Sequence, residues 1–278
     1  MKLFASCALS LHVNHPTPVV AILRPRSGLA QWLESERYRL EPWVPCSEFV
    51  DVFGNLCQRF TVPPGGMRVA VEMEVMTEDE IAVDRSAPWQ PVATLPDDVL
   101  HHLLPSRYCP SDRMEDHAWK IVGDASPGYG QVEAVTRWIH ENVEYRYGTS
   151  DASTDACDTL AKRQGVCRDF AHVGVSLCRA LKIPARMVVG YLWKLDPMDL
   201  HAWFEAFLGG RWYTFDATQA APRGGRIVLA YGRDAADVAF ISDYGKLPLS
   251  VADMEVEVRR LDEQPAAKAK PVAAPTQR

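Results

Sequence analysis

Residues 163–192, RQGVCRDFAHVGVSLCRALKIPARMVVGYL, set a cysteine between turn residues and the start of an apolar helix. Apolar side chains cover most of the helical circumference over residues 169–182, and Pro184 stops the pattern. A helix that is apolar nearly all round is a buried one, so this segment is predicted to be a core helix. The β-branched residues that follow predict a strand over 185–192.

The cysteine at the start of this helix, Cys167, has two interpretations. Cysteine reacts as its thiolate, and the unpaired N–H groups and the dipole at a helix N-terminus favour negative charge. Gln164 and Gly165 can form a tight turn ahead of it. Cys167 is therefore a candidate nucleophile, although most free cysteines are small buried residues.

A β-hairpin is predicted for residues 199–218, DLHAWFEAFLGGRWYTFDAT. A two-residue Gly-Gly turn at 209–210 pairs Trp203 with Asp216, which makes Asp216 the diagonal neighbour of His201 on the same face. Diagonal neighbours are about 7–8 Å apart, within reach of an imidazole and a carboxylate. A three-residue loop would instead place the two side chains on opposite faces.

Taken singly, His201 could be a surface histidine at a strand edge and Asp216 a turn or cap residue. Together with Cys167 they supply a nucleophile, a base and a carboxylate that holds the base. The three residues therefore fit a Cys-His-Asp triad. His172, five residues after Cys167, is the rival base, although a histidine in an apolar helix is more often a core residue.

Composition restricts the class of protein. The chain has 30 basic and 36 acidic residues and lacks a basic run, so we expect no nucleic-acid partner. It has no apolar stretch of about 20 residues, so no membrane span is expected. Seven cysteines without a C-x-x-C motif predict neither a zinc ribbon nor a disulfide framework, and a cytoplasmic location is expected. Residues 1–11, MKLFASCALSL, could pass for a short secretory signal, but their alternation favours a strand.

No metal is expected, because His101, His102 and His117 are not accompanied by carboxylates or cysteines at ligand spacing. Two other acidic residues, Asp234 and Asp237, receive no role from the sequence.

Four regions are predicted along the chain: an antiparallel β-sandwich domain over 1–85, a proline-punctuated linker over 86–114 with one short helix between 96 and 104, a core over 115–261, and a tail over 262–278 that we expect to be disordered. In the core, apolar spacing predicts a helix over 131–143. A short helix is predicted after the polar loop that follows, and further strands over 201–208, 211–216, 226–230 and 249–258.

The segments around these residues resemble the transglutaminase-like superfamily of bacterial cysteine enzymes, in the order Cys, His, Asp. The resemblance extends to GQVEAVTRWIHENVEYRYG at 130–148 and GRDAADV at 232–238, and the D-x-F-G-N motif at 51–55 resembles the N-terminal β domain of such proteins. The resemblance implies an α+β fold: an N-terminal β-sandwich-like domain followed by a papain-like core of helices on an antiparallel sheet.

The resemblance also implies a mechanism without a cofactor. The Cys167 thiolate attacks the amide of a glutamine side chain or peptide, His201 protonates the leaving amine, and Asp216 holds the useful tautomer. A thioester forms and passes its acyl group to water or an amine. The oxyanion donors would be the Cys167 backbone and a nearby aromatic residue, Tyr145 or Trp193.

Hydrolysis of a peptide, isopeptide or glutamine-type amide is expected over protein crosslinking, because water is in excess and no feature for a second substrate is evident. A protein-binding scaffold without catalysis is the alternative from a different class. The sequence leaves the exact peptide or protein substrate and the oligomeric state open.

Overall fold

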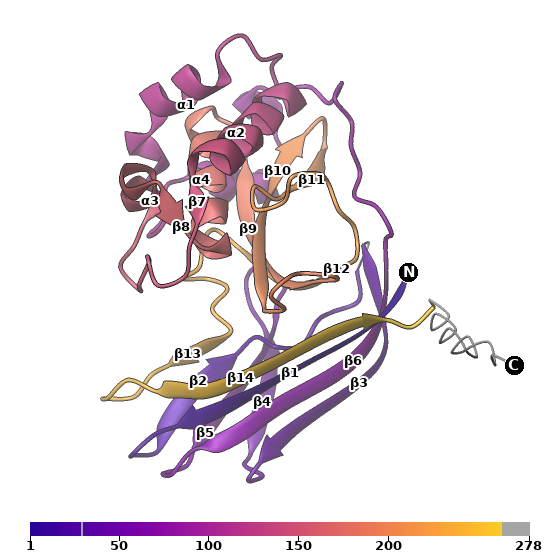
Figure 1. Ribbon diagram of the computed structural model, residues 1–278, viewed down its shortest axis with the longest axis vertical. Coiled ribbons are helices and arrows are strands. Elements are labelled where there is room, and N and C mark those ends of the chain that lie inside the picture. The colour runs from indigo at the N-terminus through magenta and orange to yellow at the C-terminus, as the bar shows by residue number, and fades with distance from the viewer. Residues whose placement is uncertain (29, 263–278) are drawn as a thin grey trace, which may run out of the picture.

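The computed structural model describes residues 1–28 and 30–262. It has an α+β architecture, with two antiparallel sheets at one end and a helical core packed on a third sheet at the other (Figure 1). The strands of the first end are β1 (Lys2–His12), β2 (Thr17–Ala21), β3 (Gln31–Glu41), β4 (Cys46–Val50), β5 (Leu56–Val62), β6 (Met67–Thr77), β13 (Ile241–Asp243) and β14 (Ser250–Arg260). The elements of the other end are α1 (Glu115–Val122), α2 (Tyr129–Asn142), α3 (Ala156–Lys162), α4 (Cys167–Ala180), β7 (Glu144–Tyr145), β8 (Gln164–Gly165), β9 (Ala185–Leu192), β10 (His201–Leu208), β11 (Arg211–Phe215) and β12 (Arg226–Gly232).

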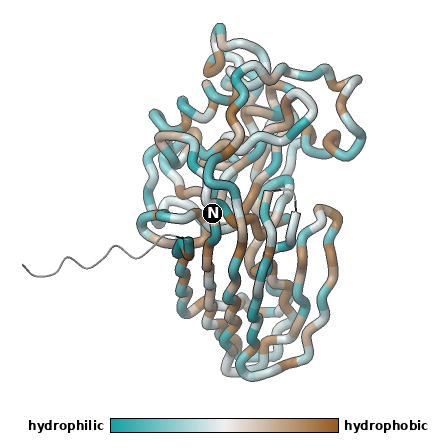
Figure 2. Tube along the Cα trace, turned by 90° about the vertical axis from the view of Figure 1, so that its right-hand side faces the viewer, coloured by the Kyte–Doolittle hydropathy of each residue, from teal (hydrophilic) through white to brown (hydrophobic). Residues whose placement is uncertain are grey.

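The N-terminal strands form two facing four-stranded sheets, in the orders β14-β1-β6-β3 and β13-β2-β5-β4. Apolar residues alternate with polar ones along β1 and β6, and every second residue is buried in one core between the sheets. Figure 2 shows this alternation as brown and teal along the strands. The predicted sandwich is confirmed, and residues 1–11 form a strand as expected.

The last strands depart from the prediction. We expected residues 115–261 to form one core, but β13 pairs with β2 and β14 runs antiparallel to β1 over nearly its whole length. In Figure 1 the yellow β14 crosses the lower sheets beside β1. The pairing covers an edge of β1 that would otherwise be open. The expected tail lies outside the described residues from 263 onward.

The connection between the two ends is mostly irregular. It carries three 3₁₀ helices, η1 (Val92–Thr94), η2 (Asp97–Leu103) and η3 (Ser111–Arg113). The short helix predicted between 96 and 104 corresponds to η2, whereas the sequence reasoning missed α1.

The helical core packs on one face of the sheet β11-β10-β9-β12, with α4 in contact with β9 and β10. The predicted core helix begins at Cys167, two residues earlier than expected. Gly174 permits the close approach, since a Cβ there would lie 2.4 Å from the Phe204 ring. None of the helices that the structure describes is long and apolar enough to span a membrane.

The β10–β11 hairpin has the predicted register. Gly209 and Gly210 adopt positive φ angles of 55° and 88°, and Phe204 pairs with Phe215 across the ribbon. The positive φ values are those of a two-residue hairpin turn, which glycine adopts without steric cost. Side chains at alternate positions of the ribbon therefore share a face as predicted.

Candidate active site

Cys167 is the first residue of α4 and is half-buried. The preceding Val166 is extended, and its N–H donates to the buried Asp169 carboxylate over 2.8 Å. A Cβ at Gly165 would lie 2.7 Å from the Asp169 Cβ, so only glycine leaves room for this cap. The turn and the cap together hold Cys167 at the positive end of the helix.

The imidazole of His201 and the carboxylate of Asp216 meet at one end of the β10–β11 ribbon. His201 Nε2 lies 2.8 Å from Asp216 Oδ2, and both side chains are almost fully buried. The predicted contact between them is therefore confirmed. The other Asp216 oxygen accepts hydrogen bonds from the Thr218 backbone N–H and hydroxyl.

The protonation of His201 depends on its two neighbours. Burial by itself lowers the pKa of His201, but the charge of Asp216 and hydrogen bonds to Asp216 and Cys167 outweigh it and raise the pKa to about 9. Since Nε2 is bonded to Asp216, Nδ1 is the ring nitrogen left for Cys167. The structure thus brings together all three residues that the sequence singled out.

Arg226, at the start of β12, is part of this site and was missed from the sequence. Its Nη2 donates to the same Asp216 oxygen that contacts His201, over 2.9 Å. Burial works to raise the pKa of Asp216, but Arg226 and His201 overcome it and hold that pKa well below its usual range. The only signal for Arg226 was its position at the start of an otherwise apolar strand.

The two aromatic candidates for the oxyanion site differ. Tyr145 lies on β7 beside Gly165 of β8, close to the Cys167 backbone. Burial and the nearby Cys167 raise the pKa of Tyr145. Trp193 instead packs against the core of the N-terminal sheets, with Lys194 over its ring, so its contacts give the oxyanion role no support.

The surroundings of His172 indicate a structural role for this side chain. It is fully buried, stacks on Tyr108 with 5.2 Å between ring centroids, and accepts the Ala235 N–H at Nε2. Burial lowers its pKa to about 3. Asp234 accepts the Tyr108 N–H in the same cluster, and Asp237 binds the Arg233 side chain. These residues support loops rather than the Cys167 site.

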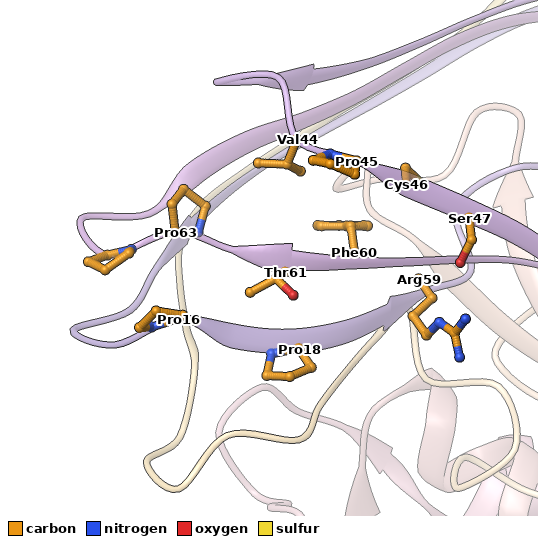
Figure 3. A pocket seen from close by; sticks show the side chains of 11 residues that line it. Pro16, Pro18, Val44, Pro45, Cys46, Ser47, Arg59, Phe60, Thr61 and Pro63 are labelled. Carbon is orange, nitrogen blue, oxygen red and sulfur yellow. The ribbon is translucent and has the colours of Figure 1, made fainter.

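Within the described ranges, no three His, Cys, Asp or Glu side chains are grouped so that they could hold a metal ion. A separate hollow of about 620 Å³ lies on the N-terminal sheet of β2, β4 and β5. Figure 3 shows Pro18, Pro45 and Phe60 on or next to these neighbouring strands. It contains neither Cys167 nor His201.

Three comparisons place these observations among known proteins. Residues 115–217 match the family model of the transglutaminase-like superfamily. A solved structure of a candidate cysteine protease from Cytophaga hutchinsonii has 37% sequence identity and a TM-score of 0.89, and the match covers 95% of this chain and 92% of that one.

Among the curated relatives, an uncharacterized protein of Mycobacterium leprae is 29% identical over 259 residues, which is 87% of this chain and 91% of that protein. An uncharacterized protein of Mycobacterium tuberculosis is 33% identical over 138 residues, or 43% of this chain and 44% of that protein. With the matched core, the high structural similarity over nearly the whole length and the Cys, His, Asp order, this chain belongs to the transglutaminase-like superfamily.

Proposed function

We propose that this protein is a cysteine-dependent hydrolase of peptide, isopeptide or glutamine-type amides, with Cys167, His201 and Asp216 as its catalytic triad. The observation that carries the proposal is the continuous chain of contacts from the Cys167 thiol through the His201 ring to the Asp216 carboxylate. The similarity to the candidate cysteine protease from Cytophaga hutchinsonii supports the same chemistry.

In the proposed reaction, the raised pKa of His201 keeps its ring protonated near neutral pH beside the Cys167 thiolate. The thiolate attacks the amide carbonyl carbon, and a tetrahedral oxyanion forms. The oxyanion then collapses to a thioester as His201 Nδ1 donates a proton to the leaving amine. Water, deprotonated by His201, attacks the thioester and releases the carboxylic acid and the thiolate.

The negatively charged oxygen of the tetrahedral intermediate needs donors. The backbone N–H of Cys167 at the start of α4 is the first, because this N–H has no partner within the helix. The Tyr145 hydroxyl, which lies close to that N–H, is the proposed second donor. Because Tyr145 lies on a two-residue strand and is 42% exposed, it has room to turn its hydroxyl toward the substrate oxygen.

A substrate screen of the full chain tests the proposal. Peptide cleavage, ammonia release from glutamine peptides and incorporation of the amine monodansylcadaverine are measured together for the wild type and for Cys167→Ala. Cys157→Ala is the matched control, since Cys157 is also a half-buried free cysteine. We expect cleavage or ammonia release that Cys167→Ala abolishes and Cys157→Ala preserves.

Amine incorporation in place of hydrolysis would identify a crosslinking enzyme with the same triad. Alkylation with iodoacetamide provides a readout independent of the substrate. Selective, pH-dependent labelling of Cys167 supports the triad, whereas labelling equal to that of the other cysteines would support a non-catalytic scaffold.

A further inference from the structure

A cavity of about 750 Å³ lies on the face of the β11-β10-β9-β12 sheet opposite α4. Trp203, Glu205 and Phe207 line it, and they alternate along β10 with Phe204 and Ala206, which pack in the helical core. Its size is within the range of ligand pockets, about 300–1,000 Å³. The other wall comes from the N-terminal end of the chain, including Thr77.

The walls of the cavity are aromatic and held in place. The Arg186 guanidinium is stacked between the rings of Trp212 and Tyr231, at 4.2 and 3.8 Å from their centroids. Arg186 also forms an ion pair with Glu205 at 2.6 Å. The two rings therefore form fixed apolar surfaces with an internally neutralised charge pair between them.

Two residues that line the cavity each carry a buried donor without a partner among the described residues: Trp203 Nε1 and Arg226 Nη1. The Trp203 side chain is 1% exposed and Arg226 is 6% exposed. Arg226 stacks on Trp203 with its Cζ 4.8 Å from the ring centroid, so the two side chains are adjacent. An unpaired buried donor is costly, which indicates an acceptor that occupies this position in the working protein.

The solvent side of the cavity has the opposite character. Three exposed carboxylates, those of Glu78, Glu80 and Asp98, line it together with one exposed cation, Arg211, so acidic groups predominate there. The cavity therefore has donors at its floor, aromatic walls and carboxylates at its mouth. That arrangement is complementary to a zwitterion with an apolar middle, whose anionic end faces the floor and whose cationic end faces the mouth.

We propose that this cavity binds a short peptide by both of its termini. The C-terminal carboxylate accepts hydrogen bonds from Arg226 Nη1 and Trp203 Nε1, the apolar side chains lie against Trp212 and Tyr231, and the N-terminal ammonium faces the acidic mouth. Burial of the carboxylate beside a charged donor provides the larger share of the selectivity.

The cavity and the candidate active site share a wall. Trp203 stacks on His201 with 6.0 Å between ring centroids, and Arg226 donates to Asp216. A carboxylate on Arg226 draws this guanidinium away from Asp216 and leaves more negative charge for the His201 imidazolium. This coupling, unlike the binding itself, rests on the proposed function.

Calorimetry on the full-length Cys167→Ala protein tests the binding without turnover. The probe is the dipeptide Ala-Phe, with Ala-Phe-amide lacking the carboxylate and N-acetyl-Ala-Phe lacking the ammonium. We expect Ala-Phe to bind at least tenfold more tightly than the amide, and N-acetyl-Ala-Phe to be weakened by a smaller factor. Val228→Trp, which fills the cavity two residues from Arg226 on β12, abolishes binding, whereas Val228→Ile preserves it.

Two results would overturn the site: no saturable binding of Ala-Phe, or binding that survives Val228→Trp and so occurs elsewhere. For the coupling, the pH dependence of Cys167 alkylation by iodoacetamide is measured in the wild type with and without Ala-Phe. We expect the alkaline limb of this pH profile, which reports the loss of the His201 proton, to move to higher pH when Ala-Phe is bound. An unchanged limb with intact binding would refute the coupling alone. Failure of the hydrolysis screen would leave the calorimetric result unaffected.

Discussion

Two buried histidines, His201 on β10 and His172 on α4, show how the partners of a side chain decide its chemistry. His201 is 2% exposed and His172 is 0% exposed, so burial acts on both alike. The pKa of His201 nevertheless rises to about 9, whereas that of His172 falls to about 3. The difference is the Asp216 carboxylate, which is hydrogen-bonded to His201. Among the described residues no carboxylate is hydrogen-bonded to the His172 ring, and the charge of Asp169 does not offset burial and the nearby Arg168.

Burial alone therefore makes a histidine an inert neutral acceptor. A carboxylate that is kept ionised by an arginine and two Thr218 donors makes an equally buried ring a stable cation. Both rings are associated with α4, since its first residue, Cys167, contacts His201 and its sixth residue is His172. Position in a core helix is thus a poor guide to function without the partners.

The largest expected effect separates the two rings directly. His201→Gln should lower kcat/KM for the proposed hydrolysis by at least about 10³-fold, because the proton donor to the leaving amine is lost. His172→Gln, whose amide oxygen can still accept the Ala235 N–H, should keep kcat/KM within roughly threefold of the wild-type value. Thermal unfolding of each variant serves as the control for folding. Equal losses in the two variants would contradict the comparison.

Asp216→Asn removes the charge that distinguishes the two environments and keeps the shape. We expect kcat/KM to fall by about 10²- to 10⁴-fold, since the amide cannot hold the imidazolium or fix its tautomer. Asp234→Asn, in the His172 cluster, is the matched control and should retain activity. Full activity of the Asp216 variant would show that the carboxylate does not orient His201.

The free energy of unfolding should depend on pH through both histidines, above pH 6.5 for His201 and below pH 6.5 for His172. The raised pKa of His201 contributes stability that is complete below pH 6.5 and is lost as pH rises through about 9. The lowered pKa of His172 costs stability as pH falls from 6.5 toward 3, because only the unfolded chain takes up that proton. Each of these two effects, the alkaline and the acid arm of the stability curve, changes the free energy of unfolding by on the order of a few kcal/mol. A pKa that differs by one between the folded and unfolded chains corresponds to about 1.4 kcal/mol.

Urea unfolding between pH 4 and pH 10 measures these arms. His201→Gln should flatten the alkaline arm only, and His172→Gln the acid arm only. A variant that flattens the other arm, or neither, would mean that the two rings do not titrate as described.

The smallest effect concerns Arg226. In Arg226→Met the cation beside Asp216 is gone, so the His201 imidazolium should persist to a pH that is higher by roughly one. The alkaline limb of Cys167 alkylation reports this change, and Arg226→Lys should largely restore the wild-type limb. A lower alkylation rate with an unmoved limb would indicate that Arg226 acts only through folding.

The sequence by itself determined the local geometry of the site. Pro184 and the apolar circumference of residues 169–182 predicted the buried helix, and the Gly-Gly turn at 209–210 predicted the ribbon register that lets His201 meet Asp216. These features follow from neighbours close in sequence, because helix periodicity and turn length are local properties.

Only the tertiary structure decided the rest. It added β14 to the N-terminal sheet, brought Arg226 to Asp216, and gave His172 a partner in Ala235. Each of these contacts joins segments that no periodicity or spacing relates. The charge state of a buried ring depends on such contacts. In a medium of low dielectric, a charged or hydrogen-bonded neighbour shifts the pKa of the ring far from the ordinary value for histidine.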